Sequence, residues 1–189
     1  MRNDVSPRAR SQLASVVLAT RDRGAGAVDA IRSIVAGTYP AFEVLVIDQS
    51  DDNRTRDALA PFLNDERVHY RSSPTRGLSI ARNLGVASAR GDPIAFTDDD
   101  CVTQANWLQE LIAAFAVDDR IGIVFGSVLP GPHDPTHGFV PAYVCSKPFL
   151  GRSIADKWQV EGIGAESGGC RLADPVDGSG RAVHCRSAN

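Results

Sequence analysis

Three consecutive aspartates, Asp98, Asp99 and Asp100, follow a short apolar run at residues 94–96. Adjacent carboxylates repel one another, and a divalent cation relieves that repulsion. Mg²⁺ and Mn²⁺ prefer oxygen ligands, and Mg²⁺ usually takes one or two carboxylates and leaves positions for water and substrate phosphates. Because residues i and i+2 of an extended segment point the same way, Asp98 and Asp100 could share one cation, which would neutralise charge on a diphosphate leaving group. The alternative is a solvated acidic loop.

Polar residues also follow two other apolar runs. Residues 20–23 (Thr-Arg-Asp-Arg) come after Val16–Ala19, and Asp48 ends the run at residues 44–47. The Asp48 carboxylate could accept hydrogen bonds from a base or a ribose, or it could belong to a turn.

A glycine precedes the next helical pattern, in Gly77-Leu78-Ser79. A glycine approach to a helix N-terminus suits a phosphate, and Arg82 could supply positive charge there. The alternative is a simple helix cap with a surface arginine.

The elements that would position these residues alternate between strand and helix. Short apolar runs predict strands at residues 13–20, 43–48, 68–71, 93–97 and 121–129. Helical spacing predicts helices at residues 28–35, near 58–63 (shortened or kinked by Pro61), from an N-cap at Ser79 to Gly91, and from a cap at Thr103 through Phe115. This alternation is typical of an α/β fold with a mostly parallel sheet and helices on both faces. Ligands bind such sheets beyond the carboxyl ends of the strands, where these polar residues would meet.

Length and composition narrow the class of protein. The 189 residues are 43% hydrophobic and 23% charged, as in ordinary soluble globular domains, and the net charge of −3 gives no reason to expect nucleic acid as a partner. The longest apolar run, residues 111–117, is too short to span a membrane, and residues 1–8 lack the apolar core of a signal peptide. The four cysteines are scattered without a CxxC pair, so we expect free thiols. We therefore predict a cytoplasmic location, with attachment to the inner face of the membrane as an option.

The end of the chain has a different composition. No Ile, Phe, Tyr, Trp or Met follows Ile163, and such a segment buries too little apolar area to offset its ordering entropy. We predict an N-terminal arm at residues 1–12, one domain at 13–163, and a poorly ordered or non-native tail at 164–189. A truncation or a shifted reading frame would explain that tail.

Four segments, in order along residues 14–102, resemble glycosyltransferase family 2. Residues 16–23 (VVLATRDR) resemble the family's VVIPTYNR, and residues 37–48 (GTYPAFEVLVID) resemble its QTYPNFEVIVVDD. Residues 77–85 match G-x-S-x-ARN-x-G, and residues 96–100 (FTDDD) resemble FLDDD, the metal-binding DXD motif.

The resemblance implies a GT-A fold, with a nucleotide-sugar-binding half followed by an acceptor-binding half. It implies a metal-assisted transfer of a sugar to an acceptor hydroxyl, with UDP as the default carrier and a glycan or lipid-linked acceptor. Carried over residue by residue, the predicted donor site consists of Thr20, Asp22, Asp48, Arg82, Asp98 and Asp99. Thr20 and Asp48 would line the base pocket, Arg82 would lie by the base or diphosphate, and Asp98 with Asp100 would hold Mg²⁺ or Mn²⁺.

The chain departs from the family pattern in two ways. Ala19, Asp22 and Gln49 stand where Pro, Asn and Asp are usual. Family members present an acidic catalytic base, often in an ED pair after the DXD motif, and no ED pair follows Asp100 here. Glu161 and Glu166 are weak candidates, so the catalytic base is left unassigned.

Two alternative functions remain open at this point. The missing base fits a protein that binds a nucleotide sugar without transferring it. The order Asp98-Asp99-Asp100-Cys101-Val102 also fits the DxDx[TV] motif of haloacid dehalogenase-type phosphatases, with Asp98 as nucleophile and Asp100 as acid/base. That motif normally opens its domain, however, and the later motifs would be out of order.

Overall fold

The computed structural model describes residues 13–117, 121–129, 131 and 184–187. The chain divides into two compact units, Met1–Leu108 and Gln109–Asn189, so the division falls inside the predicted 13–163 domain. Among the described residues, no helix combines the length and the apolar character needed to cross a membrane.

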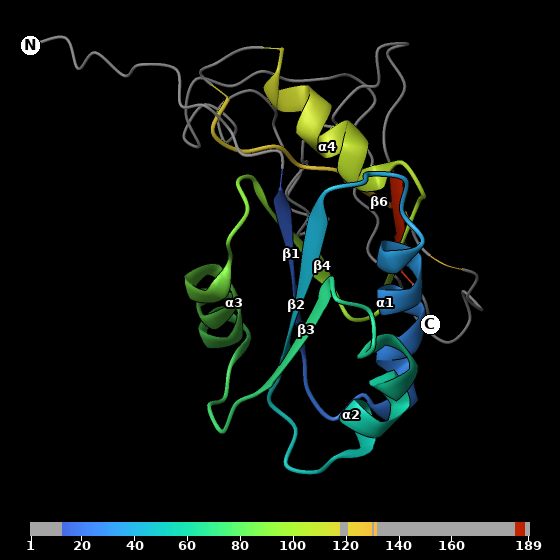
Figure 1. Ribbon diagram of the computed structural model, residues 1–189, viewed down its shortest axis with the longest axis vertical. Coiled ribbons are helices and arrows are strands. Elements are labelled where there is room, and N and C mark those ends of the chain that lie inside the picture. The colour runs from blue at the N-terminus through green and yellow to red at the C-terminus, as the bar shows by residue number, and fades with distance from the viewer. Residues whose placement is uncertain (1–12, 118–120, 130, 132–183, 188–189) are drawn as a thin grey trace, which may run out of the picture. The chain divides into compact units, whose positions relative to one another are not determined.

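The first unit is built on a parallel four-stranded sheet in the order β3-β2-β1-β4 (Figure 1). The strands are β1 (Ala14–Thr20), β2 (Phe42–Asp48), β3 (Val68–Ser72) and β4 (Ile94–Asp98). Every residue of β2 is buried, and only Ala19 of β1 is not fully so. The continuous apolar runs therefore form central strands covered on both faces, as predicted.

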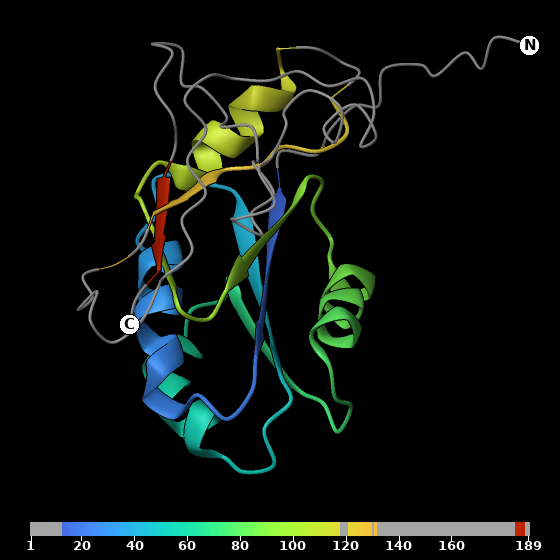
Figure 2. The same ribbon diagram turned by 180° about the vertical axis from the view of Figure 1, so that it is seen from behind.

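Helices cover the two faces of this sheet unequally. Helices α1 (Val28–Val35) and α2 (Arg54–Leu59) lie on one face, and α3 (Leu78–Ser88) lies on the other (Figures 1 and 2). Pro61 lies in the 3₁₀ segment Ala60–Phe62 that follows α2. The proline thus ends the α-helix, in agreement with its lack of an N–H donor.

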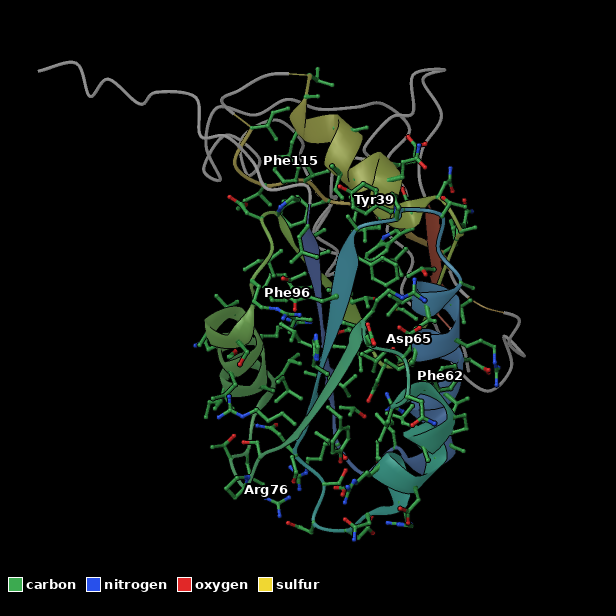
Figure 3. The ribbon with its side chains drawn as sticks, viewed as in Figure 1. Tyr39, Phe62, Asp65, Arg76, Phe96 and Phe115 are labelled. Atoms are coloured by element: carbon green, nitrogen blue, oxygen red, sulfur yellow. The ribbon has the colours of Figure 1, made fainter. Side chains whose placement is uncertain are left out.

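The packing of α3 on β1 requires a glycine. A Cβ atom at Gly85 would lie 2.3 Å from Cγ1 of Val17, closer than van der Waals contact allows. This close packing explains why the G-x-S-x-ARN-x-G segment ends in a glycine, Gly85. Phe96 is paired with Val17 across β1 and β4 and lies on the same α3 side of the sheet (Figure 3).

Several predicted boundaries are wrong. Residues 121–126 are not a strand; only β6 (Ser127–Leu129) is, and Ile123 is 55% exposed, so the apolar alternation does not reflect burial. A strand β5 (Cys101–Thr103) was missed, because three residues carry too little pattern to identify.

The predicted helix caps are also wrong. Helix α4 (Trp107–Phe115) begins beyond Thr103, whose N–H and hydroxyl both bond to Ser33 Oγ. Helix α3 begins one residue before Ser79 and ends at Ser88, short of Gly91. Its N-cap is Gly77, which has a φ of +115° that favours glycine.

In the second unit, β6 pairs in parallel with β7 (His184–Ser187). These four residues lie within the predicted tail, which stays a prediction. The rest of residues 164–189, the predicted arm at 1–12, and Glu161 and Glu166 lie outside the described residues.

Candidate functional site

A cavity of about 410 Å³ lies at the carboxyl ends of β1 and β4. Its wall includes Thr20 and Arg23 from the end of β1 and the turn after it, Gln49 after β2, Gly77 before α3, and residues 98–100 after β4. The parallel sheet thus brings segments far apart in sequence to one edge, where ligands bind such folds.

Thr20 and Asp99 form the buried floor of this cavity. They are 4% and 8% exposed. Burial raises the pKa of the Asp99 carboxyl, while the nearby Thr20 hydroxyl and the Arg23 charge act against that rise. The contact with Asp99 nevertheless lacks the geometry of an ordinary hydrogen bond. Thr20 Oγ1 is the buried side-chain polar atom among the described residues that has no hydrogen-bond partner.

Two arginines neutralise most of the aspartate cluster, residues 98–100. Arg23 spans two of its members, with Nε 3.0 Å from Asp99 Oδ1 and Nη2 2.9 Å from Asp100 Oδ2. Arg82 reaches from α3 to Asp98, with Nη2 2.7 Å from Oδ1. The negative charge of Asp99 is the main cause that raises the pKa of the Arg23 guanidinium. Arg23 therefore stays a cation throughout the accessible pH range.

Asp48 does not line the cavity. Its carboxylate is 1% exposed; Oδ1 accepts hydrogen bonds from the Ser50 N–H (2.8 Å) and hydroxyl, and Oδ2 accepts one from the Tyr70 hydroxyl (2.6 Å). Burial, followed by this hydrogen bond, raises the pKa of the Tyr70 phenol. Of the two interpretations of Asp48, this geometry favours the turn residue, because the side chain bonds the backbone two residues on.

Strand alternation separates Asp48 from Asp98, although Thr20, which lies on the Asp48 face, still lines the cavity. Asp98 is in register with Ala19, whereas Asp48 is in register with Thr20. Since Ala19 and Thr20 point to opposite faces of the sheet, the carboxylates of Asp48 and Asp98 do as well. Gln49, one residue later, reaches the cavity instead.

Gln49 connects the turn after β2 to the start of α3. Its Nε2 donates to Thr75 Oγ1 (3.0 Å), and its Oε1 accepts a hydrogen bond from the Gly77 N–H (3.1 Å). An aspartate, the usual residue here in the family pattern, has no N–H to donate. Gln49 thus fixes the glycine that borders the cavity.

Asp22 shapes the turn that presents Arg23. Its φ is +56°, a conformation that Asp tolerates better than most residues. Its N–H donates to Ser50 Oγ (2.8 Å), and its carboxylate accepts a hydrogen bond from Arg21 Nε. The Asp22 carboxylate therefore serves the turn and does not line the cavity.

Of the predicted donor residues, the structure brings Thr20, Asp98 and Asp99 to one cavity, together with the predicted metal ligand Asp100. Arg82 joins them through Asp98. The sequence placed Arg23 and Gln49 at this edge but gave neither a role, although Gln49 directly follows β2 and Arg23 lies in the turn after β1. Their placement after apolar strands was the signal in the sequence that could have identified them as site residues.

The donor set can be tested for a divalent cation. Asp98 and Asp100 are 55% and 45% exposed and line one cavity. Two accessible carboxylates are what Mg²⁺ usually takes from a protein when phosphates and water complete its shell. Within the described part of the chain, no group of three His, Cys, Asp or Glu side chains could hold a metal. The residues thus fit a cation that shares its shell with a ligand, but not an all-protein metal site.

Comparisons with known proteins agree with the motifs. The model of glycosyl transferase family 2 matches residues 15–174. An uncharacterized glycosyltransferase of Rickettsia conorii is 35% identical over 86 residues, which cover 46% of this chain and 14% of that protein. The chain therefore spans only a small part of that relative's length.

Two solved structures share the fold. Staphylococcus aureus TarS (1–349) in complex with UDP-GlcNAc aligns with a TM-score of 0.52 and 21% identity, covering 68% of this chain and 36% of TarS. The mannosyltransferase PcManGT from Pyrobaculum calidifontis, in complex with GDP-Man and Mn²⁺, aligns with a TM-score of 0.52 and 22% identity, covering 69% and 39%. At these identities the likeness concerns the fold alone, which is GT-A.

Proposed function

We propose that this chain, which belongs to glycosyl transferase family 2, binds a nucleotide-sugar donor at the carboxyl edge of its parallel sheet and serves sugar transfer to an acceptor hydroxyl. The observation that carries the proposal is the cavity where Thr20, Arg23 and the aspartate cluster meet. It combines carboxylates for a cation, guanidiniums for a diphosphate and a buried hydroxyl without a partner.

The roles of the residues follow from their positions. Asp98 and Asp100 would hold Mg²⁺ or Mn²⁺, which would neutralise the charge that develops on the departing diphosphate. Arg82 keeps Asp98 oriented from α3. Asp99 lies on the cavity floor beside Thr20, whose free hydroxyl is suited to a polar group of the donor. Asp48 acts indirectly, because it fixes the turn from which Gln49 enters the cavity.

The donor is a nucleoside diphosphate sugar, with UDP as the proposed carrier. The two fold relatives are bound to UDP-GlcNAc and to GDP-Man, so GDP is the carrier to compare with it. A glycan or lipid-linked acceptor remains the proposal. The catalytic base stays unassigned.

Family membership favours transfer over the phosphatase alternative. The second candidate, donor binding without transfer, is kept because no base is identified among the described residues. Release of UDP from a UDP-sugar, with or without an acceptor, would distinguish the two. Turnover supports transfer, and metal-dependent binding without turnover supports the binding function.

The test of the donor site is a thermal-shift titration with UDP and GDP, each with and without Mn²⁺. Ligand binding stabilises the folded chain by RT ln(1 + [L]/Kd), about 2.7 kcal/mol at a ligand concentration of about 100 Kd. We expect this Mn²⁺-dependent shift in the wild type and its loss in Asp100→Asn. The control Asp52→Asn makes the same charge change at an exposed carboxylate paired with Arg54 and should keep the shift. A full shift in Asp100→Asn would contradict the proposed site.

A further inference from the structure

We propose that Arg23 is an internal counter-ion of the aspartate cluster, and that it makes binding of the divalent cation and binding of the donor diphosphate depend on each other. This inference rests on the proposed function and extends it to the coupling between the two bound components.

The guanidinium of Arg23 bridges two members of the aspartate cluster. Arg23 donates from Nε to Asp99 and from Nη2 to Asp100, so that one side chain bridges two neighbouring carboxylates. The planar fork of arginine suits such bridging, and a charged hydrogen bond is stronger than a neutral one. Arg23 thus supplies in the first unit the positive charge that a bound cation would otherwise supply.

A bound cation and the two arginines would compete for the same carboxylates. Asp100 is a proposed cation ligand, and its Oδ2 is bonded to Arg23; Asp98, the other ligand, is bonded to Arg82. A cation that enters alone must share these carboxylates with the arginines and lie close to the positive charge of Arg23. The described residues offer no third His, Cys, Asp or Glu ligand to compensate. Binding of the bare cation is therefore opposed.

A diphosphate relieves both of these costs. Its oxygens complete the cation's shell, and they also accept hydrogen bonds from Arg23 in a geometry that arginine favours. The guanidinium can change partner without refolding, because the side chain is 47% exposed. The backbone on either side is fixed by the bonds of Asp22 N–H to Ser50 and of Gly24 N–H to Thr55.

The consequence is reciprocal coupling. If the diphosphate strengthens cation binding, the cation must strengthen diphosphate binding by the same factor. Arg23 should therefore affect the two components with opposite signs: it weakens binding of the cation alone and strengthens binding of the nucleotide with the cation.

The experiment compares wild type, Arg23→Gln, Arg23→Lys and the control Arg32→Gln. Arg32 pairs with Asp29 on α1, away from the cavity lining. Its replacement by Gln removes the same positive charge as Arg23→Gln, but outside the site. Binding of Mn²⁺ alone is measured from the EPR signal of free Mn²⁺, and binding of UDP in saturating Mn²⁺ by calorimetry. Circular dichroism melting checks that each variant is folded.

For Arg23→Gln we expect Mn²⁺ alone to bind about 3- to 10-fold more tightly, the range given by the loss of two partly exposed ion pairs. We expect UDP with Mn²⁺ to bind about tenfold more weakly, because a charged phosphate contact is lost. Arg23→Lys keeps the charge and should stay within about twofold of wild type for Mn²⁺ alone. Arg32→Gln should change neither affinity.

Two outcomes separate this inference from the proposed function. No Mn²⁺-dependent UDP binding in the wild type overturns the proposed function. If Arg23→Gln leaves the binding of UDP with Mn²⁺ unchanged, the counter-ion role is overturned while the donor site stands. Unchanged or weaker binding of Mn²⁺ alone by that variant overturns the counter-ion role in the same way.

Discussion

The buried Thr20 hydroxyl yields a prediction in which stability and binding change in opposite directions. Thr20 is 4% exposed, and its Oγ1 has no hydrogen-bond partner in the described structure. A buried polar group without a partner costs about 1–3 kcal/mol of folding free energy. Thr20→Val replaces that hydroxyl with a methyl group of similar size and keeps a β-branched residue in a central strand.

We expect Thr20→Val to raise the free energy of unfolding by about 1 kcal/mol, at the low end of that cost because the new methyl group lies beside the Asp99 carboxyl. For a chain of this length, that corresponds to a rise in Tm of about 2–4 °C. The affinity for UDP with Mn²⁺ should fall about 3- to 10-fold, the value of one hydrogen bond to the ligand. Urea unfolding followed by circular dichroism measures the first quantity, and calorimetry measures the second.

Thr55 provides a matched control for the same substitution. It is fully buried, but its Oγ1 accepts a hydrogen bond from the Gly24 N–H at 3.1 Å. Thr55→Val leaves that N–H unpaired and should destabilise the chain by about 1–3 kcal/mol. A destabilised Thr20→Val would refute the reasoning, because it would mean that the Thr20 hydroxyl is bonded in the folded state, with Asp99 as the nearby acceptor.

The remaining predictions concern packing and pH. Gly85→Ala places a Cβ 2.3 Å from Val17 Cγ1 and should destabilise the chain by about 1–3 kcal/mol in urea unfolding, although alanine favours helices. At Gly26 a Cβ would meet its nearest atom at 3.8 Å, so Gly26→Ala should cost nothing measurable. Burial alone would raise the pKa of Glu43, but hydrogen bonds from Ser15 and Arg90 outweigh it and lower that pKa below 4.5. The resulting stability is present above about pH 4.5 and is lost as the pH falls through the folded-state value. Glu43→Gln should therefore be less stable than wild type at pH 7, with a difference that shrinks below about pH 4, and an equal difference at both pH values would contradict this.

The sheet of the first unit could be predicted from the sequence because its strands are short apolar runs that end in polar residues. Their parallel arrangement followed from the helices between them, and it placed Thr20 and residues 98–100 at one edge. The three residues of β5 and the irregular segment 121–126 were not predictable in this way. Segments this short carry no reliable period, and partial exposure breaks the relation between apolar pattern and burial.

The register between strands could not be predicted, and it determines which face of the sheet the Asp48 side chain occupies. Because a shift of one residue moves a side chain to the other face, the pairing of Asp48 with Thr20 and of Asp98 with Ala19 separates the two carboxylates. The conformation of the turn after β1 could not be predicted from the sequence either. The positive φ angles of Asp22 and Gly24 direct Arg23 toward residues 98–100, and neither angle follows from apolar patterning.

The charges of the site favour a ligand that carries both signs. The three carboxylates of the aspartate cluster and the guanidiniums of Arg23 and Arg82 leave one net negative charge in a network of ion pairs. A free nucleoside diphosphate is repelled by the carboxylates. A free cation finds its carboxylate ligands already paired with arginines. A cation bound to a diphosphate brings an acceptor for each arginine and a cation for each exposed carboxylate, so the ion pairs of Asp98 and Asp100 that it breaks are replaced. This exchange is the physical reason to expect a metal–nucleotide complex, rather than either component alone, at the end of β1 and β4.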